Sequence, residues 1–397
     1  MKYCVLIIDG AAGWPLAAYG GKTCLELAHT PNMDAMAKAG LVGLVYTVPP
    51  RMEPSSACAC MSVLGYDPRT YYRGRSAIEA HGMGIPIGAD QVVFRCNLAA
   101  VRDGRMWSYN CGHISTSEGQ VLISSLNEKL GSDDVHFYPG VGYRHICKIK
   151  GRQDTLLATC IPPHDIPDKA IAEFLPRGPG SDLLRELMTR SEPVLRDHPI
   201  NSERRARGDI PATMIWLFWG SGTIPDMPAF KEMYGLDAAV ISGVDIVRGL
   251  ARMTGIEVLD VTGVTGDMNN DYVAQAIATS KALERYDMVV VHVEATDEAA
   301  HAGLAKDKIE AIEKVDREIV SRLRSWDKDA LRVLVLPDHA TPIEVQTHVA
   351  DPVPFMLWGS GFTPINRGRA NRFTEAEAEA TGVLIEAGYN IMGKLIG

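Results

Sequence analysis

Acidic residues follow three stretches of the sequence that are expected to form buried strands. Asp9 comes directly after the apolar run 3–8, and Asp297 and Asp338 follow 288–295 and 331–336 after one intervening residue each. Short runs rich in Val, Ile and Leu are typical of strands in a parallel sheet. Because ligands in open α/β sheets bind at the carboxyl ends of the strands, we expect these three carboxylates to meet at one edge.

Three histidines accompany these acids: His301, His339 and His348. One helical turn would place Asp297 and His301 on the same face. Taken singly, each acid or histidine fits a helix cap or a core position. Gathered together without counter-ions, they would place negative charge in a dry crevice, at a cost on the order of several kcal/mol. One or two divalent cations would remove that cost, and mixed carboxylate and imidazole ligands suit manganese, zinc or magnesium.

A possible nucleophile lies in the segment 52–58, MEPSSAC, which contains Ser55 and Ser56. A serine hydroxyl is a weak nucleophile at neutral pH, but coordination to a metal lowers its pKa. The alternative is that both serines only cap the helix that follows. Spacing alone favours the cap.

The order of predicted elements indicates an α/β fold with a doubly wound, mostly parallel sheet and an inserted, smaller α+β cap domain. We expect one domain from residues 1–85 and 206–397 and the cap from 86–205. Helices are predicted at 30–40, 116–131, about 181–190, 244–255, 271–286 and 307–326. Strands are predicted at 3–8, 41–48, 92–101, 214–219, 238–242, 257–263, 288–295, 331–336 and 355–358, with a strand pair in 135–149.

The composition is that of an ordinary enzyme, with 397 residues, 46% hydrophobic and 22% charged. A net charge of −9 argues against nucleic acid or an anionic membrane as partner. The apolar stretch near the start is too short for a signal peptide or a membrane span, so we expect a cytoplasmic protein. Its eight cysteines would then stay reduced. The sequence does not reveal the oligomeric state.

Four segments together resemble a known family: IIDGAAGWP (7–15), SSACACMSVLGYDPRTYYRGRSAIEA (55–80), HVEATDEAAHAG (292–303) and LPDHATPIEVQTHVADPVPF (336–355). They are similar to the cofactor-independent phosphoglycerate mutases of the archaeal type, in the alkaline phosphatase superfamily. The resemblance implies interconversion of 3- and 2-phosphoglycerate through a phosphoserine at Ser56, beside two metal ions. It assigns one ion to Asp9, Ser56, Asp338 and His339, and the other to Asp297, His301 and His348.

The predicted cap departs from that family. Where similar mutases have Asp-Arg-Arg-Ala-Gly-Arg-Ile, this chain has SYNCGHI (108–114), without arginine, the preferred partner of carboxylate and phosphate. The segments 112–116, 137–145 and 292–301 instead resemble a bacterial branch proposed to be a metal-dependent homoserine kinase, which implies an amino-acid hydroxyl as acceptor and ATP as donor. A weaker alternative is a non-catalytic, metal-bound scaffold. Candidate substrate-binding residues are Arg73, Arg75, Arg95, His113, Arg144 and His164, although each arginine could instead be a surface or ion-paired residue.

Overall fold

The computed structural model describes residues 1–362 and 369–397 and divides into two compact units. The first unit contains residues 1–72 and 226–397, and the second contains residues 73–225. The boundaries expected from the sequence, 85/86 and 205/206, both fall inside the second unit. No helix in the described part of the chain has the length and apolar character that a membrane span requires.

The first unit is built on a sheet that, in the described residues, has eight strands in the order β13-β2-β12-β11-β1-β10-β8-β9. Only β12 runs antiparallel to its neighbours β11 and β2, which confirms the predicted α/β fold with a mostly parallel sheet. The strands are β1 Lys2–Ile8, β2 Leu41–Val45, β8 Ala238–Ile241, β9 Glu257–Val258, β10 Met288–Val293, β11 Leu331–Leu336, β12 Val353–Gly359 and β13 Leu384–Ile385.

Strand β1 lies between β10 and β11 and is parallel to both. Ile7 pairs with His292 on one side and with Leu336 on the other. The three strands therefore end at the same edge of the sheet. This register places Asp9, Glu294 and Asp338 side by side, as parallel strand ends require.

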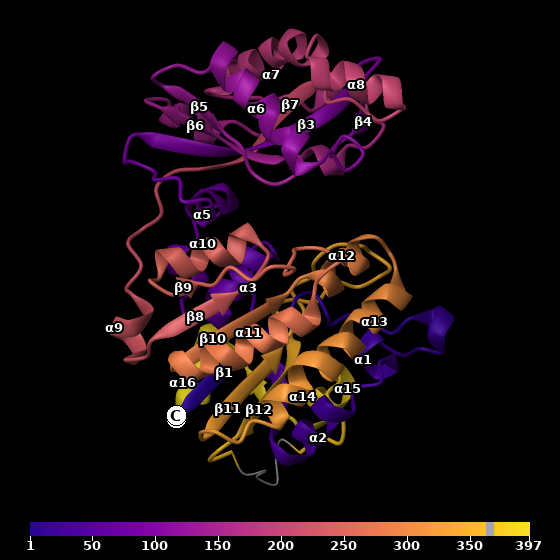
Figure 1. Ribbon diagram of the computed structural model, residues 1–397, viewed down its shortest axis with the longest axis vertical. Helices are drawn as coiled ribbons and strands as arrows, with labels where there is room; N and C mark the ends of the chain where they lie inside the picture. Colours follow the sequence, from indigo (N-terminus) through magenta and orange to yellow (C-terminus); the bar gives the residue numbers. More distant parts are fainter. Residues whose placement is uncertain (363–368) are drawn as a thin grey trace. The chain divides into compact units, whose positions relative to one another are not determined.

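Helices cover both faces of this sheet. On one face, α2 (Pro31–Ala39), α11 (Tyr272–Arg285), α13 (Ala305–Lys314) and α14 (Ser321–Arg324) share an apolar core with alternate residues of the strands (Figure 1). On the other, α16 (Ile391–Ile396) contacts β11, and α3 (Ser56–Val63) contacts α10 (Asp245–Met253). The remaining helices are α1 Cys24–Leu27, α4 Pro68–Tyr71, α9 Phe230–Tyr234, α12 Ala295–His301 and α15 Glu375–Ala380.

The second unit has an antiparallel sheet in the order β4-β3-β6-β5, with β7 also paired to β3. Helices α6 and α7 contact each other, and they pack on β5 and β7 respectively (Figure 1). The elements are α5 Arg75–Gly82, β3 Gln91–Arg102, β4 Arg105–Ser108, α6 Thr116–Leu130, β5 Val135–Tyr138, β6 Arg144–Lys150, α7 Ser181–Arg196, α8 Pro199–Arg207 and β7 Met214–Ser221.

Four sequence predictions need correction. The strand expected at 214–219 forms β7 in the second unit, because an apolar run fits any buried strand and only its pairing with β3 decides the sheet. The strand expected at 257–263 is limited to Glu257–Val258. A second helix, α8, follows the one expected near 181–190.

The fourth correction concerns the long helix expected at 307–326. A π-helical segment, Val315–Val320, interrupts it between α13 and α14. Such segments re-aim side chains within a helix. Here the carboxylate of Asp316 accepts hydrogen bonds from Asn32 N (3.2 Å) and Met33 N (2.7 Å) in the first turn of α2. The N-cap residue of α2, Thr30, makes no capping hydrogen bond with its side chain.

Candidate metal centre

The first predicted ligand set gathers at the ends of β1 and β11. Asp9, Asp338 and His339 are all fully buried, and each offers a ligand atom within 4.8 Å of the others. His339 Nε2 lies 3.5 Å from Asp9 Oδ1 and 3.4 Å from Asp338 Oδ2. Burial, and then the charge of Asp338, raises the pKa of Asp9 well above its usual range. A bound cation would favour the ionised form that burial opposes.

Hydrogen bonds occupy both oxygens of Asp338 and one oxygen of Asp9. Asp338 Oδ1 accepts from Gly10 N (3.2 Å) and from His339 N (2.9 Å). Asp9 Oδ2 lies 2.8 Å from His292 Nε2. Asp9 Oδ1 is buried and has no hydrogen-bond partner among the described residues. An unpartnered carboxylate oxygen is costly in the interior, so this donor set fits a divalent metal ion.

The second predicted set lies beside the first. Asp297 and His301 belong to α12, and one helical turn places their side chains together, with 3.1 Å between Asp297 Oδ2 and His301 Nε2. His348 Nε2 lies 3.5 Å from the same oxygen and 2.9 Å from His301 Nε2. Two imidazole nitrogens at this distance must share a proton or a cation.

Both histidines of this set are held through their other ring nitrogen. His301 Nδ1 is 2.8 Å from the carbonyl of Gln346, and His348 Nδ1 is 3.3 Å from that of Pro54. Their Nδ1–H groups therefore donate to carbonyls, and the Nε2 atoms face Asp297. Although burial opposes it, the hydrogen bond to Asp297 raises the pKa of His301 to about 9. In turn His301 and His348 hold the pKa of Asp297 well below its usual range despite burial.

Ser55 and Ser56 have different positions. Ser55 is the N-cap of α3, and its Oγ accepts from Cys58 N at 3.4 Å. Ser56 begins the helix, and its Oγ lies 3.2 Å from His339 Nε2. The capping interpretation thus applies to Ser55, and of the two serines it is Ser56 whose hydroxyl contacts the first ligand set.

Comparisons with known proteins agree with this geometry. Residues 37–201 match the family model described as 2,3-bisphosphoglycerate-independent phosphoglycerate mutase. A protein of that name from Methanothrix thermoacetophila is 45% identical over 399 residues, which cover 100% of both chains. The chain belongs to this family. A probable mutase of the same name from Geobacter sulfurreducens is 44% identical over 402 residues, again covering 100% of both chains.

Solved structures of two similar proteins support the fold. The PH0037 protein of Pyrococcus horikoshii has a TM-score of 0.82 and 29% identity, over 100% of this chain and 96% of the other. The cofactor-independent phosphoglycerate mutase of Thermoplasma acidophilum has a TM-score of 0.64 and 24% identity, over 100% of this chain and 99% of the other. The predicted resemblance to the mutase family is confirmed, whereas the comparisons give no support to the homoserine kinase alternative.

In this member of the mutase family, sequence reasoning missed several residues that line the ligand sets. His292 and Glu294 alternate on β10 and just beyond it, so the strand period of two was an available signal. Burial, together with Asp297, raises the pKa of Glu294 to about 8. Cys60 Sγ lies 3.6 Å from Asp338 Oδ2. Thr341 contacts both sets, and no pattern in the sequence indicates it.

The predicted substrate-binding residues all lie in the second unit. Arg75 and Arg95 meet at Glu79, which accepts from both, and Arg95 also donates to Asn97 at 3.1 Å. The guanidinium of Arg75 lies 4.9 Å from the ring centre of Trp219. Arg75 and Arg95 are candidates to bind an anionic substrate. The carboxylate of Glu79 offsets part of their positive charge.

The other candidates lie near aromatic rings or in turns. Arg144 lies over Tyr143 at 5.6 Å, and the ring of His164 is 5.6 Å from that of Trp219. His113 follows β4 in a left-handed conformation (φ 57°), with Nε2 3.4 Å from Asn110 Nδ2. Arg73 is the first residue of this unit. The structure therefore connects Arg75 with Arg95 through Glu79 and with His164 through Trp219. The role of the six residues in binding substrate stays a prediction.

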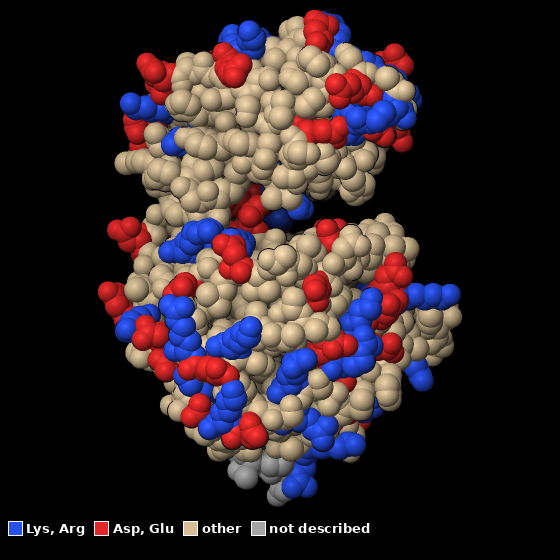
Figure 2. Space-filling model, in the orientation of Figure 1, with Lys and Arg blue, Asp and Glu red and all other residues tan. Residues whose placement is uncertain are grey.

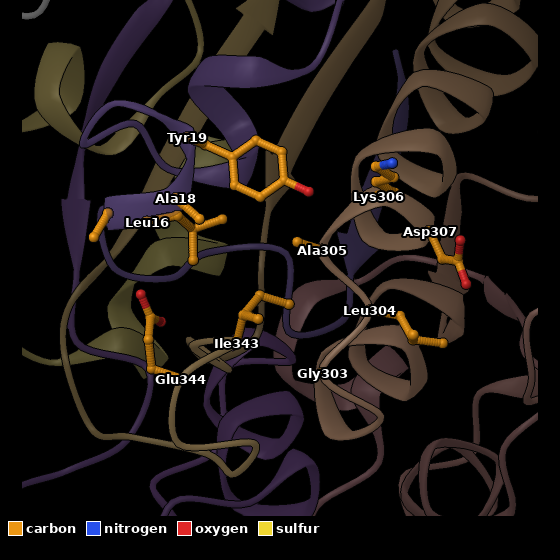
Figure 3. A pocket seen from close by; sticks show the side chains of 11 residues that line it. Leu16, Ala18, Tyr19, Gly303, Leu304, Ala305, Lys306, Asp307, Ile343 and Glu344 are labelled. Carbon is orange, nitrogen blue, oxygen red and sulfur yellow. The ribbon is translucent and has the colours of Figure 1, made fainter.

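A pocket of about 520 Å³ lies elsewhere in the first unit. Leu16, Ala18 and Glu344 line one side, and the start of α13 lines the other (Figure 3). None of the predicted site residues lines this pocket, and its walls are mostly apolar. On the molecular face in Figure 2, basic and acidic side chains are interspersed over α11, α13 and α14.

Proposed function

We propose that this chain is a 2,3-bisphosphoglycerate-independent phosphoglycerate mutase that interconverts 3- and 2-phosphoglycerate. The observation that carries the proposal is the position of Ser56, whose Oγ lies 3.2 Å from His339 Nε2 beside two buried carboxylates. Full-length relatives named as this mutase support it. The eight cysteines are free, as expected for a protein that works in the cytoplasm.

We further propose two divalent ions, either manganese, zinc or magnesium. Asp9, Asp338 and His339 would hold one of them with Ser56. Asp297, His301 and His348 would hold the other. When bound, such ions lower the pKa of a serine hydroxyl and offset the charge of a transferring phosphoryl group.

Ser56 is placed to act as the covalent relay. Its Oγ attacks the phosphorus of 3-phosphoglycerate, the bond from phosphorus to O3 breaks, and the serine proton goes to O3. Phosphoserine and glycerate result. After glycerate turns, its O2 attacks the same phosphorus, the bond to Ser56 Oγ breaks, and the O2 proton returns to the serine. Ser56 is only 7% exposed, which limits the access of water to the phosphoserine.

The cap segment gives a reason to test a second acceptor. Residues 108–114 contain no arginine, and Asn110 Oδ1 accepts hydrogen bonds from Gly112 N (3.1 Å) and His113 N (3.5 Å). The loop is thus held by its own polar groups. Homoserine, an amino acid whose carboxylate and ammonium charges cancel, would require fewer arginines than the multiply anionic phosphoglycerate.

The test is a pair of coupled assays on purified chain supplied with Mn²⁺. We expect turnover of 3-phosphoglycerate without added 2,3-bisphosphoglycerate, and no ADP release from homoserine plus ATP. The reverse result would replace the mutase by the kinase. Activity in neither assay, with Mn²⁺, Zn²⁺ or Mg²⁺, would favour the non-catalytic scaffold.

A further inference from the structure

The hydroxyl of Thr341 lies between the two ligand sets. Its Oγ1 is 3.2 Å from His339 Nδ1 in the first set and 2.6 Å from Asp297 Oδ1 in the second. Thr341 is fully buried. One side chain therefore contacts a ligand of each proposed ion, and the contacts use the atoms that do not face the ions.

The direction of these hydrogen bonds follows from the donors available. The carboxylate of Asp297 only accepts, so the Thr341 hydroxyl donates to it. A hydroxyl has one proton, which leaves its oxygen to accept from His339. The proton of the neutral imidazole must then be on Nδ1, so that the lone pair of Nε2 faces Ser56, Asp9 and Asp338.

We propose that Thr341 is a positioning residue shared by both ion sites. It fixes the ring tautomer of His339 and at the same time the orientation of Asp297, so that loss of this single hydroxyl weakens both sites. The inference rests on the proposed function, because it requires that the two sets bind ions. Groups that orient metal ligands from behind typically contribute about 10–100-fold to affinity.

The backbone around Thr341 is held independently of the hydroxyl. Its amide donates to Ala12 O at 3.0 Å. The buried ammonium of Lys308 donates to Thr341 O (2.9 Å) and to Ala12 O (3.1 Å). Since these bonds use only main-chain atoms of Thr341, a Thr341→Val substitution removes the hydroxyl and leaves the anchoring in place.

The experiment is a Mn²⁺ titration of the metal-free full chain by calorimetry and electron paramagnetic resonance. We expect Thr341→Val to lower the affinity for both ions by about 10–100-fold. Thr341→Ser keeps the hydroxyl, so its affinity for each ion should stay within about threefold of that of the unmodified chain. Thr279→Val is the matched control, because Thr279 is buried and its hydroxyl donates to the helix carbonyl of Gln275 (2.8 Å). It should bind both ions normally.

Unchanged affinity in Thr341→Val, or weakening of one ion only, would overturn the inference. If the unmodified protein itself binds fewer than two ions, that result would instead overturn the two-ion part of the proposed function. A second measurement needs no variant. Nitrogen-15 spectra of the metal-free protein should show His339 protonated on Nδ1, and protonation on Nε2 would equally refute the role of Thr341.

Discussion

His292 Nε2 lies 2.8 Å from Asp9 Oδ2, and both side chains are fully buried. Burial lowers the pKa of His292 to about 4, so its ring is neutral near pH 7. Ser242 Oγ lies 3.2 Å from the other ring nitrogen, Nδ1. A neutral ring that accepts from Ser242 donates from Nε2 to Asp9. This bond turns the unpartnered Oδ1 of Asp9 toward Asp338 and His339.

The first prediction follows from this pair. Replacing His292 by alanine frees Asp9 to rotate, so we expect affinity for Mn²⁺ to fall by about 10–100-fold. Calorimetric titration of the metal-free protein measures it. His136→Ala is the control, because His136 is an exposed residue of β5 in the second unit. Equal Mn²⁺ affinity in both variants would show that His292 does not orient Asp9.

The second prediction separates the two adjacent serines. Ser56→Ala removes the proposed relay, so we expect turnover of 3-phosphoglycerate to fall by about 10³-fold or more. Ser55→Ala removes only the N-cap bond to Cys58, at about 1 kcal/mol of stability, and should keep most activity. A steady-state assay and thermal unfolding measure both variants. Full turnover by Ser56→Ala would exclude the covalent route.

Much of this centre could be predicted because it depends on strand ends. Asp9 and Asp338 follow apolar runs, and parallel strands bring their carboxyl ends to one edge whatever their order. Asp297 and His301 were linked by the helical period. Local periodicity therefore predicts that these side chains gather at one edge, without knowledge of the strand order.

Other features depend on long-range packing and have no local signal. His292 is one polar residue in an apolar strand, and only the pairing of β10 with β1 brings it to Asp9. Strand β7 joins the second unit through its partner β3. The π-helical segment at 315–320 is set by the contact of Asp316 with α2. Thr341 acquires its role from two contacts made across the fold.

The third prediction concerns the pH dependence of stability. Although burial opposes it, Arg95 and Arg75 lower the pKa of Glu79 to about 2. A carboxylate with a lowered folded-state pKa stabilises the protein above its unfolded pKa of about 4.3. That contribution, roughly 3 kcal/mol at 1.36 kcal/mol per pKa unit, is lost as the pH falls from about 4.5 to about 2.

Denaturant unfolding of Glu79→Gln tests this stability effect in the second unit. We expect the variant to be less stable than the unmodified chain at pH 6, with the difference shrinking below about pH 4.5 as Glu79 becomes protonated. Glu186→Gln is the control, because Glu186 forms an exposed pair with Arg190 (2.9 Å), and such pairs contribute about 0–1 kcal/mol. A difference for Glu79→Gln that is the same at every pH would contradict the prediction.

The fourth prediction uses two glycines with similar backbones. Gly10 has φ +60° and Gly21 has φ +74°. A Cβ at Gly10 would lie 2.6 Å from Thr341 Oγ1 and would also overlap Asp297, whereas a Cβ at Gly21 would meet nothing within 4 Å. Both alanine variants suffer the strain of a left-handed residue, roughly 1–2 kcal/mol. Only Gly10→Ala displaces the hydrogen bond between Thr341 and Asp297.

We therefore expect both glycine variants to unfold at lower temperature and only Gly10→Ala to lose Mn²⁺ affinity, by about 10-fold or more. Thermal unfolding of the metal-free proteins measures the strain that they share, and calorimetry measures the ion binding that separates them. Gly21→Ala controls for backbone conformation. If both variants lose Mn²⁺ affinity, the cause is backbone strain and not the displacement of Asp297. Normal Mn²⁺ binding by Gly10→Ala would mean that Asp297 tolerates displacement, contrary to the tight packing between the two ligand sets.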